Sequence, residues 1–260
     1  MRNNFILFIT ALMLLFLTAC TDNEKQNISP ETVVQTNQPE EAKPTATEQV
    51  ILPLDGKIIC VDAGHGINSS NEKEAIAPNS AEKKRAFVSG TRGKNQTEEE
   101  LNLSVALKLE EKLKALGAEV HMTRKTHETT LSNIGRAKFA NELSADISVK
   151  LHADGIENSS ARGVSMLVPA NKHVKSEVYS ESLKIGEIIL DEVVKQTGAP
   201  DRGVVKRSDM TGFNWSEVPV VLLEMGFMTN PEEDALMETD DYQNKIVEGI
   251  ANGILKYFEQ

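Results

Sequence analysis

The chain has 260 residues, of which 28 are basic and 39 acidic, and its net charge at neutral pH is −11. This negative charge excludes nucleic acid as a partner, because proteins that bind nucleic acids need a basic surface against the phosphates. It also excludes attachment to anionic lipid through charge alone. Any association with a membrane must therefore come from another feature of the chain.

Residues 1–19 predict a secretory signal peptide. Arg2 precedes an apolar run from Phe5 to Leu17, and these 13 positions are too few to cross a bilayer as a helix. The run ends in Leu17-Thr18-Ala19-Cys20, which resembles the lipobox of bacterial lipoproteins, in which the cysteine is lipidated. This resemblance implies a lipid on Cys20 and an extracytoplasmic location, anchored to the cell membrane. A plain signal peptide with an incidental cysteine is the alternative.

Residues 20–50 are expected to form the lipidated Cys20 followed by a disordered tether. The segment has no aromatic residue and contains three prolines, so it cannot bury enough apolar surface to offset the entropy of ordering it. The other cysteine, Cys60, stands in the apolar run 58–61 and is expected to be a small buried core residue. With Cys20 lipidated, no cysteine pair remains for a disulfide.

From residue 51 to residue 260, short apolar runs alternate with amphipathic stretches, and this pattern predicts one folded domain. In chain order we expect a strand over 57–61, a helix over 98–116, a strand over 118–123, a helix over 132–143, strands over 146–151 and 163–168, a helix over 176–196, strands over 203–206 and 219–223, and a helix over 241–258. Apolar strands that alternate with helices indicate an α/β fold, with a mostly parallel sheet covered on both faces. We expect a single three-layer α/β/α domain with a mostly parallel central sheet of about six strands.

Three unusual polar residues, His65, His152 and Glu224, stand where predicted strands end. In open α/β sheets, ligands bind outside the carboxyl ends of the strands. Two imidazoles and a carboxylate form a zinc ligand set that leaves a fourth position for water, so the residues alone suggest Glu224 as the third ligand. The plainer alternatives are surface histidines, a Glu224 paired with an arginine such as Arg136, and glycines beside His65 that serve only a turn.

Four motifs follow one another along the chain. They are Val61-Asp62-Ala63-Gly64-His65-Gly66, Glu98-Glu99-Glu100-Leu101-Asn102-Leu103, Lys150-Leu151-His152-Ala153 and Leu223-Glu224-Met225-Gly226-Phe227-Met228-Thr229-Asn230. Together they resemble the zinc-dependent N-acetylmuramoyl-L-alanine amidases of the Amidase_3 type. The resemblance extends from about Lys57 to Phe258, so residues 51–260 are expected to be a zinc amidase catalytic domain.

The resemblance implies a peptidoglycan hydrolase that cleaves the amide bond between N-acetylmuramic acid and the L-alanine of the stem peptide. Its implied cofactor is Zn²⁺, bound by His65, Glu98 and His152, and its implied catalytic residue is Glu224. This assignment replaces the suggestion that Glu224 is a ligand. The expected partner is the peptidoglycan substrate, and we expect the protein to be a monomer.

The choice of Glu98 as the third ligand depends on the resemblance. The family's liganding glutamate lies four residues before the Asn of its Asn-Leu pair, which is Asn102 in this chain. Glu99 and Glu100 are immediate neighbours and remain alternatives. An acidic first turn that complements the helix dipole would explain any of the three without a metal.

The remaining polar features receive a structural interpretation or stay open. His121, His127 and His173 are interpreted as structural or exposed. Trp215 either contacts substrate or fills the edge of the core. The long polar segment 67–96 either faces the substrate or is a disordered insertion.

Two other functions are compatible with these residues. One is a catalytically silent envelope lipoprotein that binds peptidoglycan or regulates other proteins. The other is a zinc peptidase that acts on the stem peptide, since metal, water and glutamate would do the same chemical work there. Only the family resemblance favours the amidase over the peptidase.

Overall fold

The computed structural model describes residues 51–260. The predicted signal peptide, the predicted lipidation of Cys20 and the predicted tether lie outside these residues. None of the helices formed by the described part of the chain combines the length and the apolar character that crossing a membrane requires.

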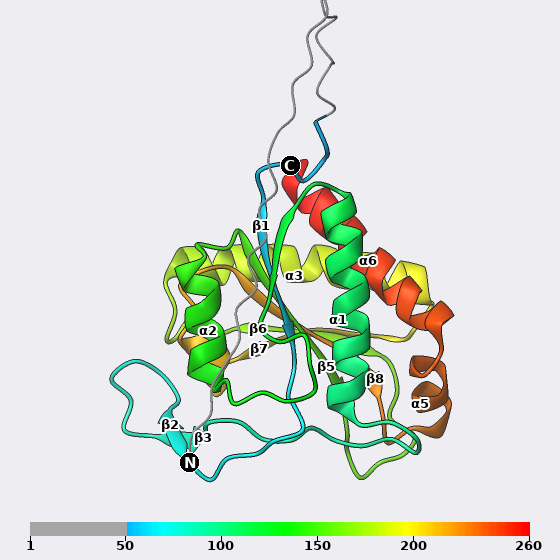
Figure 1. Cartoon of the computed structure of the whole chain (residues 1–260), viewed down its shortest axis with the longest axis horizontal. Helices are drawn as coiled ribbons and strands as arrows, with labels where there is room; N and C mark the ends of the chain where they lie inside the picture. The colour runs from blue at the N-terminus through cyan, green and yellow to red at the C-terminus, as the bar shows by residue number, and fades with distance from the viewer. Residues whose placement is uncertain (1–50) are drawn as a thin grey trace, which may run out of the picture. The chain divides into compact units, whose positions relative to one another are not determined.

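A six-stranded sheet forms the centre of the domain (Figure 1). Its strands are β1 (Ile58–Ala63), β4 (Glu119–Met122), β5 (Ile147–Asp154), β6 (Val164–Pro169), β7 (Asp201–Arg207) and β8 (Val220–Phe227). They lie in the order β4-β1-β5-β8-β6-β7. Neighbours from β4 to β8 pair in parallel, β6 is antiparallel to β8, and β7 is parallel to β6. The prediction of a mostly parallel sheet of about six strands is confirmed.

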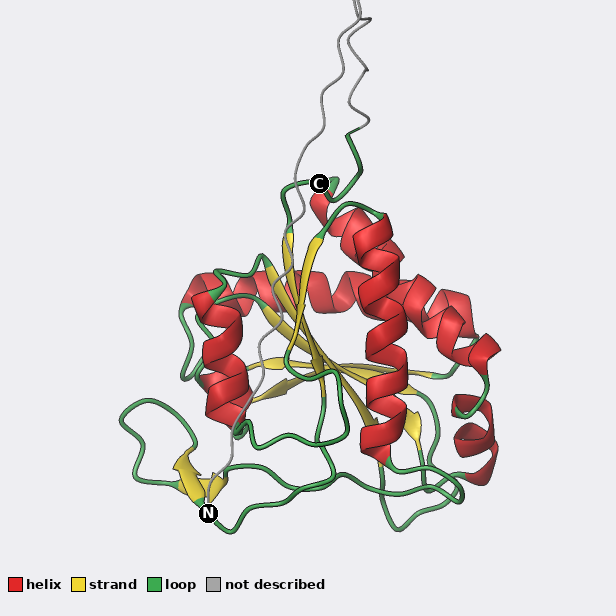
Figure 2. Cartoon of the chain, viewed as in Figure 1, coloured by secondary structure: helices red, strands yellow, loops and turns green. Residues whose placement is uncertain are grey.

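Helices cover both faces of this sheet (Figure 2). They are α1 (Glu98–Ala115), α2 (Asn133–Glu142), α3 (Ser176–Thr197), α4 (Thr211–Asn214), α5 (Pro231–Met237) and α6 (Asp240–Phe258). The main apolar core joins α1, α3 and α6 to one face of the sheet. Helices α2 and α4 contact each other and cover smaller apolar clusters on the opposite face. The domain therefore has the three layers that the sequence predicted.

The two faces of the sheet differ in chemistry because successive side chains of a strand point to opposite sides. Val61, Val149 and Leu223 are buried in the core under α1, α3 and α6. One position away along β1 and β5, Asp62 and Lys150 point to the other face and line a cavity there. The face covered by α2 and α4 is thus the one that carries charged groups.

A capping box marks the start of helix α1. The side chain of Thr97 accepts a hydrogen bond from the backbone N–H of Glu100, and the side chain of Glu100 accepts one from the backbone of Thr97. Leu101 and Leu109 then bury one side of the helix in the core. The cap determines where the helix starts and thereby places Glu98 in its first turn.

Segment 67–96 forms an ordered hairpin rather than a disordered insertion. Strand β2 (Lys73–Ala75) pairs antiparallel with β3 (Lys83–Arg85). Trp215 anchors the hairpin, since its indole Nε1 donates to the carbonyl of Ala75 over 2.9 Å. This contact gives Trp215 a structural role as a support of the hairpin.

The strand ends differ from the predicted ones. Strands β5 and β8 continue to Asp154 and Phe227, because backbone pairing persists past the apolar runs that marked the strands in the sequence. His152 and Glu224 consequently lie within strands instead of following them. The short helix α4 and the hairpin were not predicted, since neither has a hydrophobic period of its own.

Candidate metal centre and active site

His65, Glu98 and His152 come together from three separate elements. His65 follows β1, Glu98 opens α1 and His152 lies in β5. The Nε2 atom of His65 is 3.1 Å from Oε1 of Glu98, and Nδ1 of His152 is 3.0 Å from the same oxygen. Within residues 51–260, this is the only group of at least three His, Cys, Asp or Glu side chains whose ligand atoms all lie within 4.8 Å of one another.

The spacing of these atoms fits a tetrahedral metal ion. Zinc bonds of about 2.0–2.1 Å at the tetrahedral angle place neighbouring ligand atoms roughly 3.3 Å apart. The two distances from Oε1 of Glu98 to the histidine nitrogens, 3.0 and 3.1 Å, are close to that value. A set of two imidazoles and one carboxylate suits zinc and leaves a fourth position for water. The residues present therefore fit the metal that is typical of the resembled family.

The hairpin segment sets the orientation of the His65 ring. The Nδ1 atom of His65 is 2.8 Å from the carbonyl oxygen of Val88. Because a carbonyl can only accept, Nδ1 carries a proton, and Nε2, which faces Glu98, is the ring nitrogen left for a metal. An outer hydrogen bond of this kind selects the tautomer of a metal-binding histidine.

Of the three consecutive glutamates, only Glu98 reaches the two histidines. Its Oε2 also accepts a hydrogen bond from the backbone N–H of Thr91 over 2.8 Å. Glu99 turns toward Nδ1 of His127 at 2.9 Å, and Glu100 caps the helix. The geometry thus separates three residues that the sequence left as alternatives.

The charge on Glu98 is stabilised despite its burial. Burial by itself would raise the pKa of this carboxyl, because a charged group loses its hydration. Hydrogen bonds and charge from His152 and His65 outweigh that effect and hold the pKa of Glu98 well below its ordinary value. The group stays ionised, as a metal ligand must be.

Two buried arginines hold the backbone around His65. Arg124 donates to the carbonyl oxygens of Ala63 and Gly64, each over 2.9 Å. Arg136 donates to the carbonyl of His65 over 2.6 Å. His65 has a positive φ of 59°, a conformation that a side chain other than glycine adopts at a cost, so these bonds stabilise it.

Asp62 joins Arg136 to Lys150 beneath this loop. The carboxylate pairs with both cations, and all three side chains are buried. Burial would raise the pKa of Asp62, but the charges of Arg136 and Lys150 lower it well below its ordinary value. The suggested Arg136–Glu224 pair was therefore wrong, because Asp62 takes that place. The sequence feature that indicates this network is the presence of charged residues inside otherwise apolar strands.

Glu224 lies beside the three candidate ligands because β5 and β8 are neighbours. In the parallel register of these strands, Glu224 is the partner of His152. Its Oε2 atom is buried and has no hydrogen-bond partner among the described residues. Burial raises the pKa of Glu224 well above its ordinary value, and the charges of Glu98 and Asp154 raise it further. A raised pKa suits a carboxylate that accepts a proton and later returns it.

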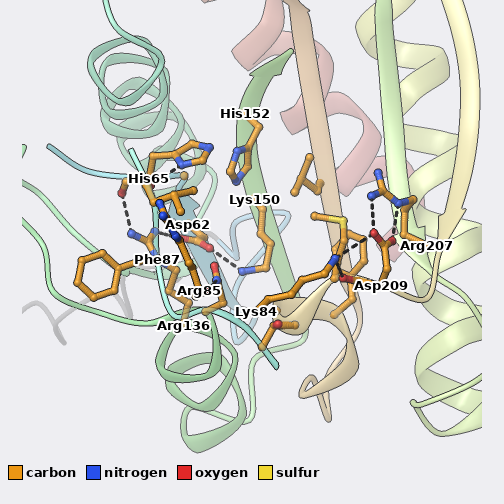
Figure 3. Close-up of a pocket in the computed structure, with 18 of the residues that line it drawn as sticks. Asp62, His65, Lys84, Arg85, Phe87, Arg136, Lys150, His152, Arg207 and Asp209 are labelled. Atoms are coloured by element: carbon orange, nitrogen blue, oxygen red, sulfur yellow. Dashed lines mark hydrogen bonds and ion pairs between the residues drawn. The ribbon is translucent and has the colours of Figure 1, made fainter. Parts of the chain in front are cut away.

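The site opens on a cavity of about 640 Å³. Sheet residues, α2, α4 and the β2–β3 hairpin line it. Figure 3 shows His65, His152 and Lys150 on one side and Lys84 of the hairpin reaching toward Asp209. The hairpin thus forms part of the cavity wall.

Comparison with known proteins agrees with this geometry. Residues 59–256 match the family of N-acetylmuramoyl-L-alanine amidases called Amidase_3. The chain belongs to this family. It is accordingly a peptidoglycan amidase that acts outside the cytoplasm, and zinc dependence is typical of the family.

Individual relatives share most of the described domain. The chain is 27% identical to a germination-specific N-acetylmuramoyl-L-alanine amidase of Bacillus subtilis, over 80% of this chain and 83% of the relative. It is 29% identical to an amidase of Mycobacterium tuberculosis, over 75% and 86% of the two chains. The crystal structure of the amidase Ami1 of Mycobacterium smegmatis is similar with a TM-score of 0.73, 26% identity and coverage of 79% and 98%. The predicted family and fold are confirmed.

The structure brings all four residues predicted from the resemblance to one place. His65, Glu98 and His152 form the cluster, and Glu224 adjoins it. Their individual roles stay predictions. His127, which the sequence placed among structural or exposed histidines, contacts Glu99 outside the cluster.

Proposed function

We propose that His65, Glu98 and His152 bind Zn²⁺ and that Glu224 is the general base and general acid of this amidase. The bond hydrolysed is the amide between N-acetylmuramic acid and the L-alanine of the stem peptide. The single observation that supports the assignment best is the register of β5 and β8, which sets Glu224 beside His152. A proton-accepting carboxylate thereby stands next to three candidate ligands.

The residues of this chain divide the chemical work. When bound, the metal supplies a Lewis acid and lowers the pKa of a coordinated water toward about 7. Glu224 accepts a proton from the attacking water and later returns it to the nitrogen of the leaving L-alanine. Glu98 and the two histidines keep the metal in place, and Asn102 supports Glu98 and the carbonyl of Gly64 through its amide.

A catalytically silent binding protein is the weaker hypothesis. Such a protein would be free to lose a metal ligand or the catalytic carboxylate, and the described residues include both. A peptidase that cuts within the stem peptide differs from the amidase only in where the substrate lies. The family to which the chain belongs supports the amidase.

Mass spectrometry of digested peptidoglycan tests this proposal. The amidase releases intact stem peptides from the glycan, whereas shortened stems would support the peptidase. Glu224→Gln should keep the fold and the metal but lose roughly 10²–10⁴ in rate. Near-normal release of stem peptides by this variant would contradict the role of Glu224.

We further propose that the protein is a monomeric lipoprotein. Residues 1–19 are its signal peptide, Cys20 carries the lipid, and residues 21–50 tether the amidase domain 51–260 to the outer side of the cell membrane. The apolar run from Phe5 to Leu17, followed by Thr18-Ala19-Cys20, supports the signal peptide and the lipid anchor. Cys20→Ser should move the protein from the membrane fraction to the soluble one, and retention in the membrane fraction would contradict the proposal.

A further inference from the structure

The cavity beside the candidate active site is cationic in an acidic domain. Residues 51–260 hold more acidic than basic groups, and their net charge is −8. Basic side chains nevertheless outnumber carboxylates along the cavity wall. A local reversal of charge of this kind favours anionic ligands at that surface.

Four of these cations already have partners. Arg136 and Lys150 pair with Asp62 on the floor of the cavity. Lys84 and Arg207 share Asp209 at the opposite side, at 3.1 and 2.8 Å. These ion pairs form part of the cavity wall. Because each of the four cations is already paired with a carboxylate, they offer little free positive charge to a ligand.

Three further cations have no such partner. Lys73, Lys83 and Arg85 line the cavity, and their side chains are exposed. Within residues 51–260, no carboxylate oxygen lies within 4.0 Å of their side-chain nitrogens. All three belong to the β2–β3 hairpin.

The hairpin that carries them is held in place from two directions. On one side, the backbone N–H of Asn133, at the start of α2, donates to the carbonyl of Ala86 over 2.8 Å. On the other, Asn214 of α4 donates from Nδ2 to the carbonyl of Ile76 over 2.9 Å. Since the backbone is already ordered, a ligand that binds here does not have to order it.

We propose that Lys73, Lys83 and Arg85 bind free carboxylates of the stem peptide and so direct the peptide, rather than the glycan, along the hairpin. This inference rests on the proposed function, because the peptide must enter the cavity where the amide bond is cut. Stem peptides carry free carboxylates, and an arginine and two lysines offer several charge-assisted hydrogen bonds to such groups. The three residues are binding residues and take no part in the proton transfer.

The test compares two triple variants with equal loss of charge. The first carries Lys73→Gln, Lys83→Gln and Arg85→Gln. The matched control carries Lys94→Gln, Lys172→Gln and Lys175→Gln, three exposed lysines outside the cavity. Circular dichroism and thermal unfolding establish that both variants keep the fold.

Each protein is given two synthetic muramoyl peptides, one with free carboxylates and one with these groups amidated. For the hairpin variant we expect KM on the free-acid substrate to rise about tenfold or more, with the effect in KM and not in kcat. The control should match the unmodified protein. Added salt should raise the KM of the unmodified protein on this substrate more than that of the hairpin variant.

Equal KM values for the hairpin variant and the control on the free-acid substrate would overturn the inference. So would an equal loss on both substrates, because carboxylates would then not be the groups recognised. Calorimetric titration of the free-acid peptide into Glu224→Gln, with and without the three hairpin substitutions, separates binding from cleavage. If no substrate is cut but the hairpin substitutions weaken this binding, the proposed function fails and the carboxylate site stands.

Discussion

Replacing Asp62 with Asn is the most informative single perturbation of the fold beneath the site. Asp62, Arg136 and Lys150 are only 2%, 5% and 5% exposed. Asn keeps the size of the side chain but removes the one negative charge that both cations share. Uncompensated buried charges cost far more free energy than the loss of an exposed pair, because water cannot replace the missing partner.

We expect Asp62→Asn to lower the free energy of unfolding by about 3–5 kcal/mol. Typical domains have only about 5–15 kcal/mol in total, so the effect is easily measured. The assay is urea unfolding at neutral pH in the presence of a chelator, which removes any contribution from metal. The control is Asp209→Asn, whose side chain is 47% exposed and whose loss should change stability by no more than about 1 kcal/mol.

The pH dependence gives a second measurement of the same carboxyl. The pKa of Asp62 is lowered in the folded state, so its contribution to stability is present above the unfolded pKa of about 3.9 and is lost as pH falls below it. The difference between the unmodified protein and Asp62→Asn should therefore be complete at pH 7 and shrink in acid. A loss below about 1 kcal/mol at pH 7, or a loss independent of pH, would refute the reasoning.

Three other substitutions follow from the site. Glu224→Gln should stabilise the metal-free protein against urea at pH 7 but not below pH 4, because the pKa of Glu224 is raised in the folded state and its ionisation costs stability as pH rises. Gly64→Ala would put a Cβ atom 2.4 Å from the ring of His152, and chelator competition should show zinc affinity reduced about 10–100-fold. Trp215→Phe leaves the carbonyl of Ala75 without its donor and should cost about 0.5–1.5 kcal/mol in thermal or urea unfolding.

Each of these expectations has a clear contrary result. If the Glu224→Gln protein is less stable than the unmodified one at pH 7, burial of this carboxyl does not lower the free energy of unfolding. Normal zinc affinity in Gly64→Ala would mean that His152 can move aside without loss. For Trp215→Phe, faster amide exchange should be confined to the hairpin and its neighbours, and a uniform change across the domain would argue against a local anchor.

Much of this protein is determined by local features of its sequence. Apolar runs and helical periods predicted the strands and helices of the sheet domain, since both patterns depend only on neighbours along the chain. The start of α5 is also fixed locally, because the side chain of Asn230 accepts hydrogen bonds from the backbone N–H groups of Glu232 and Glu233. Motif order was enough to indicate the family.

Tertiary structure alone decided which polar residues meet. Glu98, Glu99 and Glu100 are consecutive residues of the same type, so the sequence does not distinguish them. The packing of α1 next to β5 brings only Glu98 to His152. The strained backbone of His65 and its arginine supports join segments far apart in the chain. Long-range pairing of this kind leaves no periodic signal in the sequence, because it depends on strand order and on loop conformation.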